Sequence, residues 1–242
     1  IPLSVICAAL GDEVESDSVK EKLARWYWCG VFGEMYGGAN ETRYAMDLVD
    51  VVKWVRGGEE PRTVRDSSFQ PTRLLSLQTR QSAAYKGIFA LLINAGSSDF
   101  INGDNIELTN FFELNVDIHH IFPRAYCNQL GLPRAQWNSV VNKAPLTART
   151  NRILGGKAPS EYLEGIERNH GVDPSRLDNF LQSHLTEPSM LRTNDFGGFL
   201  QTRAGFLLDA IERATGKAIS GRDSLEVQEA FGGSLRAAGA EA

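Results

Sequence analysis

Apolar residues recur at helical spacing through the first third of the chain. In SVKEKLARWYWCGVF and in ETRYAMDLVDVVKWV they return every three or four positions, and paired glycines follow the two runs at Gly37–Gly38 and Gly57–Gly58. This period, ended by glycine, predicts amphipathic helices. A further helix is expected over about Gln81–Ala95. We therefore expect residues 1–100 to form a helical region.

The middle of the chain has a different pattern. NVDIHHIF alternates as a short strand does and ends before Pro123, and NSVVNKAPLT offers a second extended stretch that Pro145 interrupts. The segment ARTNRIL is typical of a short helix, with Thr147 or Thr150 as its cap and Gly155–Gly156 after it. This order predicts a compact ββα unit within residues 101–165.

Beyond this unit the helical pattern returns. Helices are expected in APSEYLEGIERNHG, PSRLDNFLQSHL and NDFGGFLQTRAGFLLDAIERATG, so residues 166–220 should pack as helices on the ββα unit. Residues 221–242 are small, polar and rich in glycine and alanine, which predicts a flexible tail. The predicted fold class is mainly α, with a small ββα core embedded between helical segments.

Composition narrows the class of protein. The chain has 242 residues, of which 42% are hydrophobic, enough to bury a core. No apolar run approaches the roughly 18 residues of a membrane span, so no membrane partner is expected. The start lacks a methionine and a basic segment, which indicates a piece of a longer protein rather than a signal peptide. Three scattered cysteines, Cys7, Cys29 and Cys127, favour a reducing cytoplasm.

Charge is unevenly distributed along the chain. The net charge is −5, yet the segment 117–159 holds a single acid, Asp117. Its basic residues are Arg124, Arg134, Lys143, Arg149, Arg152 and Lys157. A local basic surface in an acidic protein is the pattern that a polyanion would use, although basic residues also cluster by chance on a solvated face.

Two adjacent histidines, His119 and His120, lie in the expected first strand. Successive strand side chains point to opposite faces, so one ring can bind a metal ion while the other acts as a base; a structural pair is the alternative. Asn142 and Asn151 add amide oxygens, which are uncharged ligands suited to a divalent cation. A base for water, a cation and a basic surround are what phosphodiester hydrolysis requires.

The motif VDIHHIFP, followed by Asn142 and Asn151, resembles the HNH (His-Me finger) nucleases with their ββα-metal core. The string VVNKAPLTARTNRILGGKAPSEYL extends this resemblance to the C-terminal HNH domain of GmrSD-like restriction enzymes, which include the SspE-type phage-defence effectors. The resemblance is specific over about Val116–Leu163. It is looser over EKLARWYWCGVF and ETRYAMDLVDVVKW, which resemble the helical link to an N-terminal nucleotide-hydrolysing domain. No Walker-type loop occurs in this sequence.

The resemblance implies a role for each residue of the motif. His120 takes the position of the general base, and Asn142 that of the asparagine that braces the base and its loop. His119, where many relatives carry aspartate, and Asn151 take the two metal-ligand positions. Without a carboxylate ligand the cation should bind more weakly, so Mn²⁺, Ni²⁺ or Co²⁺ could outperform Mg²⁺. Asp117 lies on the same strand face as His119 by alternation and is an alternative source of charge.

The expected partner is double-stranded DNA. Basic residues that would neutralise its phosphates are Lys143, Arg149, Arg152, Lys157 and Arg124. The resemblance implies a metal-dependent endonuclease or nickase in the bacterial cytoplasm, acting in restriction or antiviral defence together with the upstream nucleotide-hydrolysing domain. Nicking is the default for a single metal site. The alternative is a DNA-binding or regulatory module with a dormant ββα fold that does not cleave.

Overall fold

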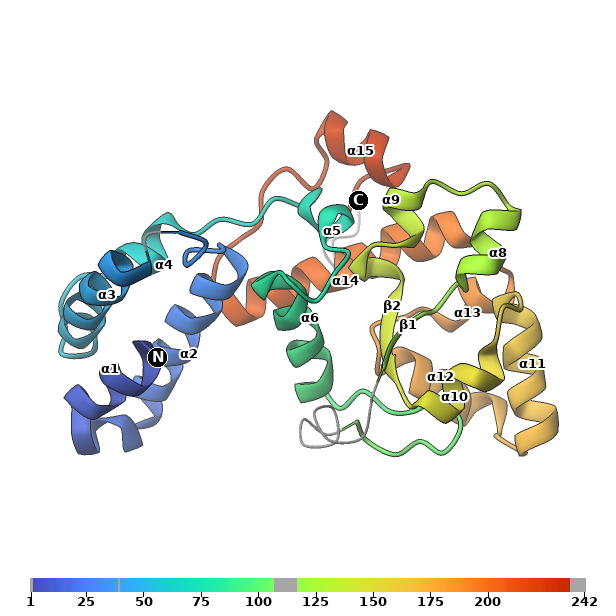
Figure 1. Cartoon of the computed structure of the whole chain (residues 1–242), viewed down its shortest axis with the longest axis horizontal. Helices are drawn as coiled ribbons and strands as arrows, with labels where there is room; N and C mark the ends of the chain where they lie inside the picture. Colours follow the sequence, from blue (N-terminus) through green and yellow to red (C-terminus); the bar gives the residue numbers. More distant parts are fainter. Residues whose placement is uncertain (1, 39, 107–116, 236–242) are drawn as a thin grey trace. The chain divides into compact units, whose positions relative to one another are not determined.

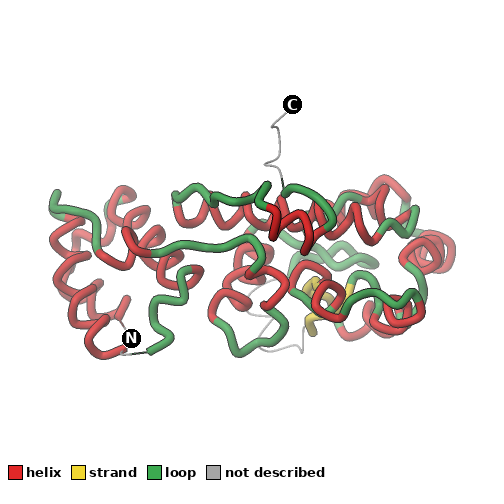
Figure 2. The backbone as a smooth tube through the Cα atoms, turned by 90° about the horizontal axis from the view of Figure 1, so that it is seen from above, coloured by secondary structure: helices red, strands yellow, loops and turns green. Residues whose placement is uncertain are grey.

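The structure, a computed structural model, describes residues 2–38, 40–106 and 117–235. Helices and loops make up most of this chain, and the strands are confined to one short patch (Figure 1; Figure 2). This confirms a mainly α protein with a small antiparallel sheet. The first half of the described chain contains α1 (Pro2–Leu10), η1 (Gly11–Glu15), α2 (Asp17–Phe32), α3 (Asn40–Val55), α4 (Arg62–Asp66), α5 (Arg73–Ser76), α6 (Ala83–Asn94), β1 (Asp117–His120), α8 (Arg124–Gln129) and α9 (Arg134–Trp137). The second half contains η2 (Val140–Asn142), β2 (Lys143–Leu146), α10 (Ala148–Leu154), α11 (Pro159–His170), α12 (Pro174–Gln182), α13 (Pro188–Arg192), α14 (Phe196–Thr215) and α15 (Leu225–Phe231).

The chain divides into two compact units. Unit 1 comprises Ile1–Gln70 and Ala210–Ile219, and unit 2 comprises Pro71–Asp209 and Ser220–Ala242. The helices α5 and α6, which fall within the helical region expected over residues 1–100, therefore belong to the same unit as the sheet.

Unit 1 closes its helices around an apolar core and a buried carboxylate. Asp47 accepts hydrogen bonds from the hydroxyl groups of Tyr36 (2.6 Å) and Thr63 (2.7 Å), which satisfies its charge inside the unit. The helix α2 ends at Phe32, before the paired glycines that were expected to stop it, and Glu34 just beyond it has a φ of 48°. The core residues are Ile6, Leu10, Val19, Leu23, Trp26, Cys29, Val51, Trp54 and Val64.

Unit 2 contains the two-stranded antiparallel sheet. The register pairs Asp117 with Leu146 and His120 with Lys143, so the last residue of β1 lies opposite the first residue of β2. Pro145, opposite Ile118, is tolerated because each strand of a two-stranded sheet has one unpaired edge. The expected strand began at residue 115, and its first two residues lie outside the described ones.

The short helix α10 follows the second strand, as its sequence predicts. The Thr147 side chain accepts a hydrogen bond from the backbone N–H of Thr150, a cap that stabilises a helix by about 1 kcal/mol. The helix ends at Gly155, whose φ of 56° suits glycine. The order strand, strand, helix therefore matches the expectation for this segment, with α8, α9 and η2 between the strands.

The segment after β1 is held by the helices around it. Phe122 is fully buried, and its ring centroid lies 5.2 Å from that of Phe196 and 4.9 Å from that of Phe199, both on α14. The Tyr162 hydroxyl on α11 donates to the carbonyl of Ile121 at 3.0 Å. Ring packing and a buried hydrogen bond together fix the end of β1, which is where His120 lies.

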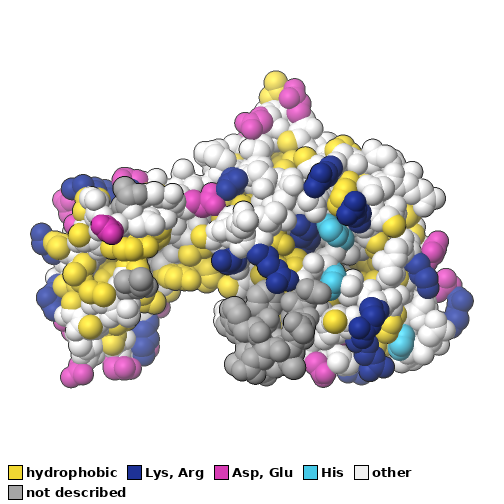
Figure 3. Space-filling model, viewed as in Figure 1, with side chains coloured by type: hydrophobic (Ala, Val, Ile, Leu, Met, Phe, Trp, Pro, Cys, Tyr) yellow, Lys and Arg dark blue, Asp and Glu magenta, His cyan; other side chains and the backbone are white. Residues whose placement is uncertain are grey.

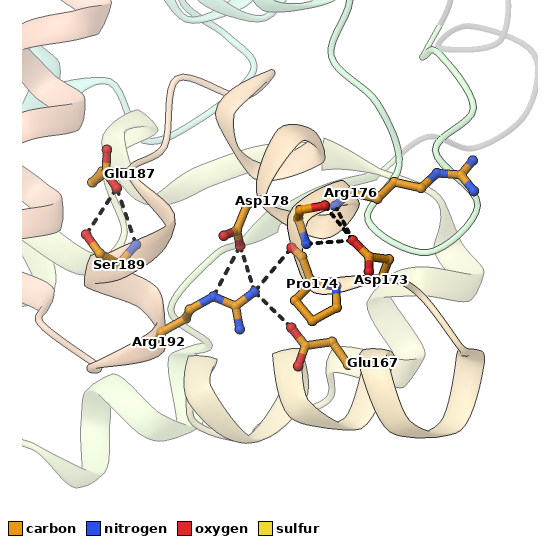
Figure 4. A network of polar contacts seen from close by, with 9 residues as sticks. Glu167, Asp173, Pro174, Arg176, Asp178, Glu187, Ser189 and Arg192 are labelled. Carbon is orange, nitrogen blue, oxygen red and sulfur yellow. Dashed lines mark hydrogen bonds and ion pairs between the residues drawn. The ribbon is translucent and has the colours of Figure 1, made fainter.

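One arginine links the helices that follow. Arg192 on α13 pairs with Glu167 on α11 (2.8 Å) and with Asp178 on α12 (2.6 Å), as Figure 4 shows. The same figure shows Asp173 and Glu187, which accept hydrogen bonds at the starts of α12 and α13. These partly exposed ion pairs link three short helices, and each contributes little to stability.

The described part of the C-terminal segment contains a helix that its composition does not suggest. Residues 221–242 were expected to form a flexible tail, but α15 lies within them, capped by the Ser224 side chain, with Val227 and Phe231 buried. The capping serine and the two apolar residues four positions apart outweigh the small residues around them. None of the described helices combines the length and the hydrophobicity that crossing a membrane requires.

Candidate functional site

His120 ends β1 in a half-buried position beside the end of α9. Its Nε2 atom lies 3.2 Å from Oδ1 of Asn138, and its ring meets the edge of the Trp137 ring at 5.5 Å. Both contacts come from the end of α9, which the 3₁₀ turn η2 joins to β2. The imidazole is therefore fixed by one polar and one aromatic contact.

The surroundings keep His120 uncharged at neutral pH. Burial lowers its pKa to about 4, the Asn138 hydrogen bond opposes this, and the electrostatic effect of Lys143, His119 and Arg124 lowers the pKa further. A neutral imidazole has one nitrogen that can accept a proton. Nδ1 of His120 makes no hydrogen bond to any described residue, and the ring keeps part of its surface exposed. Nδ1 is therefore the candidate proton acceptor.

The Asn142 side chain is fully buried and hydrogen-bonds to the backbone of two segments. Its Oδ1 atom accepts from the backbone N–H of Phe122 at 2.8 Å, and its Nδ2 atom donates to the carbonyls of Phe122 (2.9 Å) and Trp137 (2.8 Å). These bonds tie the segment after His120 to the end of α9. Asn142 thus joins the two segments that contact His120 without facing solvent itself.

One of the two expected metal ligands comes from β1 and the other from the helix that follows β2. His119 lies in β1 opposite Ala144, and Asn151 lies on α10, just beyond the end of β2. Both side chains are half-buried, and the Asn151 amide has no hydrogen-bond partner among the described residues. The backbone of Asp117 pairs with Leu146, but its side chain lies outside the described residues. Its role as an alternative ligand stays a prediction.

A buried acid fixes the start of the helix that carries Asn151. Asp99 is 1% exposed; its Oδ2 atom accepts from the backbone N–H of Thr147 at 3.1 Å, and its Oδ1 atom accepts from the Thr150 hydroxyl at 2.6 Å. Oδ1 also accepts from the N–H of Ile101. A carboxylate at a helix start satisfies free N–H groups and favours the helix dipole, so Asp99 orients α10.

Lys143 lies inside the site rather than on the surface. It is 6% exposed, its Nζ atom donates to the carbonyl of Gln78 at 2.7 Å, and it lies over the Tyr85 ring. Burial lowers its pKa to about 8, which still leaves it charged at neutral pH. In this position Lys143 supplies positive charge beside His120, whereas the phosphate contact expected of it would require the side chain to become exposed.

The other basic residues of this segment are exposed. Arg124, Arg149, Arg152 and Lys157 form no ion pair with any residue that the structure describes. Arg124 also lies over the Trp137 ring, at 6.0 Å, next to His120. Figure 3 shows histidine side chains reaching the surface among Lys and Arg side chains on this face of unit 2. Exposed cations without acid partners attract anions.

Three residues of this site were not identified from the sequence. Asn138 contacts His120, Gln78 contacts Asn138 at 3.3 Å, and Asp99 caps α10. Gln78 and Asp99 come from the region N-terminal to β1, where no motif signals their role. Asn138 begins the segment NSVVNK, but its sequence signal is that of a turn residue and not of a histidine partner.

Comparison with known proteins finds one relative. The chain is 27% identical over 217 residues to the uncharacterized protein MJ0686 of Methanocaldococcus jannaschii, which covers 79% of this chain. This chain spans 37% of the length of that relative. No protein family model matches the chain. No solved structure matches it.

Proposed function

We propose that this chain is a metal-dependent DNA endonuclease or nickase that hydrolyses phosphodiesters by a one-metal HNH mechanism. The observation that carries the proposal is the arrangement around the sheet. His120 ends β1 with an uncharged ring and a free Nδ1 atom, the buried amide of Asn142 braces it, and α10 follows with Asn151. The resemblance of VDIHHIFP and the two asparagines to the HNH nucleases supports the same assignment.

In this mechanism His120 is the general base. Nδ1 takes a proton from a water molecule, the water oxygen attacks phosphorus, and the bond from phosphorus to the 3′ oxygen breaks. The low pKa ensures that the base form is present at neutral pH but weakens the base. The negative charge of a bound phosphate would raise this pKa toward the working pH. A solvent water protonates the leaving 3′ oxygen, so the products are a 5′ phosphate and a 3′ hydroxyl.

In this proposal His119 and Asn151 would hold a divalent cation. Imidazole and amide oxygen provide two uncharged ligands, which leave the remaining positions to water and phosphate. When bound, the cation supplies charge neutralisation at the scissile phosphate and at the leaving 3′ oxygen. A ligand set without a carboxylate favours Mn²⁺, Ni²⁺ or Co²⁺ over Mg²⁺ because these ions accept imidazole more readily.

The exposed cations would hold the DNA backbone. Arg149 and Arg152 lie on α10 with Asn151, while Arg124 and Lys157 lie on either side of that helix in sequence. Their charge is not neutralised by acids of the described chain, which supports double-stranded DNA as the partner. We extend the proposal to the wider role that the resemblance implies, an effector of restriction or phage defence that works with a nucleotide-hydrolysing domain.

One observation favours a second function, a DNA-binding or regulatory module that does not cleave. Across the described residues there is no group of three or more His, Cys, Asp or Glu side chains that could hold a metal ion. A nuclease of this design depends on one imidazole and one amide, and weak metal binding would leave it dormant. DNA binding through the same exposed cations would then remain.

A plasmid-relaxation assay distinguishes the nuclease from the module that binds DNA without cleaving it. Supercoiled DNA is incubated with the chain and Mn²⁺ or Mg²⁺, with chelator as one control and Asn151→Ala as another. We expect nicked circles with Mn²⁺, none with chelator, and a strong loss in Asn151→Ala. Cleavage that persists in chelator, or that Asn151→Ala leaves unchanged, would exclude the metal mechanism. DNA binding without any cleavage in either metal would favour the module.

A further inference from the structure

Two side-chain amides form a hydrogen-bond chain that ends on His120. Nε2 of Gln78 donates to the carbonyl of Leu75 at 3.3 Å, and Nδ2 of Asn138 donates to Oε1 of Gln78 at 3.3 Å. Oδ1 of Asn138 then faces Nε2 of His120 at 3.2 Å. We refer to Gln78 and Asn138 as the amide pair. Both side chains are half-buried, so each is shielded in part from competing water.

The Leu75 carbonyl fixes the direction of these hydrogen bonds. A backbone carbonyl can only accept, so Gln78 must present its N–H group to Leu75 and its oxygen to Asn138. Asn138 must then donate to Gln78 and turn its own oxygen to His120. Reversing either amide alone, or both together, sets two acceptors against one another. Nε2 of His120 therefore carries the proton.

The amide pair is also fixed through its backbone. The Lys143 ammonium donates to the carbonyl of Gln78 at 2.7 Å, and the N–H of Val140 donates to the carbonyl of Leu77 at 2.8 Å. The Asn142 side chain donates to the carbonyl of Trp137, the residue before Asn138. Residues of η2 and β2 thus restrain the backbone at or next to both members of the pair.

We propose that Gln78 and Asn138 are positioning residues that hold His120 as the Nε2–H tautomer, with the lone pair of Nδ1 turned away from Asn138 and available as the base. The tautomer assignment stands on the hydrogen bonds alone, while its catalytic role rests on the proposed nuclease function. An imidazole without such a partner populates both tautomers and rotates, and the Nδ1–H form has no lone pair at the atom that must accept the proton.

Nitrogen-15 spectra of the histidine side chains test the tautomer directly. The metal-free protein is recorded over a pH series that includes the neutral form of the ring, and the His120 signals are those that His120→Ala removes. We expect one protonated and one unprotonated nitrogen, well separated, with Nε2 protonated. In Asn138→Ala the two shifts should move toward one another as the second tautomer appears. Gln136→Ala is the matched control: it also lies on α9, where its amide donates to the carbonyl of Ala230.

Steady-state cleavage kinetics test the catalytic role. Asn138→Ala should lower kcat by about 10-fold to 100-fold with little change in KM, because loss of an outer partner misorients the base without removing DNA contacts. Asn138→Asp should recover part of kcat, since its carboxylate still accepts from Nε2–H. Gln78→Ala should give a smaller loss than Asn138→Ala, because Asn138 remains beside the ring. Gln136→Ala should leave both constants unchanged.

Each outcome separates this inference from the proposed function. A Nδ1–H tautomer in the parent protein, or an Asn138→Ala variant with unchanged shifts and unchanged kcat, would overturn the positioning role even if DNA is cleaved. If the tautomer responds to Asn138→Ala but no condition gives cleavage, the amide pair orients the ring as inferred and the nuclease function fails.

Discussion

Burial lowers the pKa of both His120 and His184 to about 4, and in both rings Nε2 faces an oxygen acceptor. For His184 the acceptor is the carbonyl of Ser98, at 2.8 Å, and the Phe100 ring packs edge-on at 5.1 Å. His184 is fully buried, and its Nδ1 atom has no hydrogen-bond partner among the described residues and no access to solvent. His120 keeps its ring partly exposed.

The regions around His120 and His184 therefore differ in solvent access to the ring, and not in the pKa or the tautomer of the histidine. Around His120 the neighbours include Lys143 and exposed cations that suit a phosphate, whereas the charged neighbours of His184, Asp99 and Arg203, are themselves buried. A lowered pKa marks a candidate base only where a substrate atom can reach the free nitrogen. The two regions also share a partner, because the buried Arg203 donates to the carbonyls of His184 (3.1 Å) and Val141.

Replacing His120 and His184 in separate variants should give the largest difference in cleavage rate. His120→Ala should lower the rate of plasmid nicking by about 10²–10⁴-fold, the usual contribution of a general base. His184→Gln should stay within a few-fold of the parent, since the glutamine amide can still donate to Ser98. The comparison uses single-turnover rates with saturating metal. Equal losses in the two variants would mean that His120 acts through the fold as His184 does.

The pH dependence of stability gives the next contrast. The pKa of His184 is about 4 in the folded protein and about 6.5 when unfolded, so the unfolded chain takes up the proton first as pH falls. Stability is unaffected above about pH 6.5 and falls between there and about pH 4. The groups around the ring are Asp99, which raises this pKa, and Arg203, which lowers it.

From pH 7 to pH 4.5, His184 should account for about 2 to 3 kcal/mol of the lost free energy of unfolding. Urea titrations at both pH values measure this loss, and His184→Gln should reduce it by that amount because it removes the titrating group. His120 adds a loss of the same sign in both proteins and so does not mask the difference. If both proteins lose equal stability, His184 does not stay uncharged in the fold.

Asp99 bonds to Thr150 on α10 and also raises the pKa of His184. Its replacement should therefore affect both regions, with a smaller expected effect. Asp99→Asn removes a charged acceptor from the start of α10 and should cost about 1 to 2 kcal/mol in urea unfolding. Because α10 carries Asn151, the Mn²⁺ concentration for half-maximal cleavage should rise several-fold. Asp104→Asn, an exposed acid of the same loop whose partner is Asn102, is the control. A normal Mn²⁺ response in Asp99→Asn would show that the cap does not orient Asn151.

Local structure in this chain followed from local sequence. Thr147 caps α10, Gly155 ends it, and β1 stops before Pro123, because caps, glycines and prolines act through their own backbone. The helices over Ala83–Asn94 and Pro159–His170 likewise lie where the apolar period predicted them. These features need no information from distant parts of the chain.

The contacts that complete the site could not be predicted in the same way. Asp99 reaches Thr150 across 51 positions, and Gln78 reaches Asn138 across 60. Such pairs depend on how the segments that follow α5 and α6 pack against the ends of α9 and α10. The burial of Lys143 was missed for a related reason: it lies in a basic segment, but its position in β2 turns it toward Tyr85.

The smallest effect concerns the exposed cations near His120. If Arg152 contacts a DNA phosphate, Arg152→Gln should weaken binding a few-fold and reduce the slope of log affinity against log salt by about 1, since one fewer counterion is released. Arg176→Gln is the matched control, because Arg176 is an exposed arginine of α12, the helix that leads to His184. Fluorescence anisotropy with a labelled duplex over a salt series measures both slopes. Identical slopes for the two variants would mean that DNA does not distinguish the two regions, and the assignment of the His120 face as the binding surface would fall.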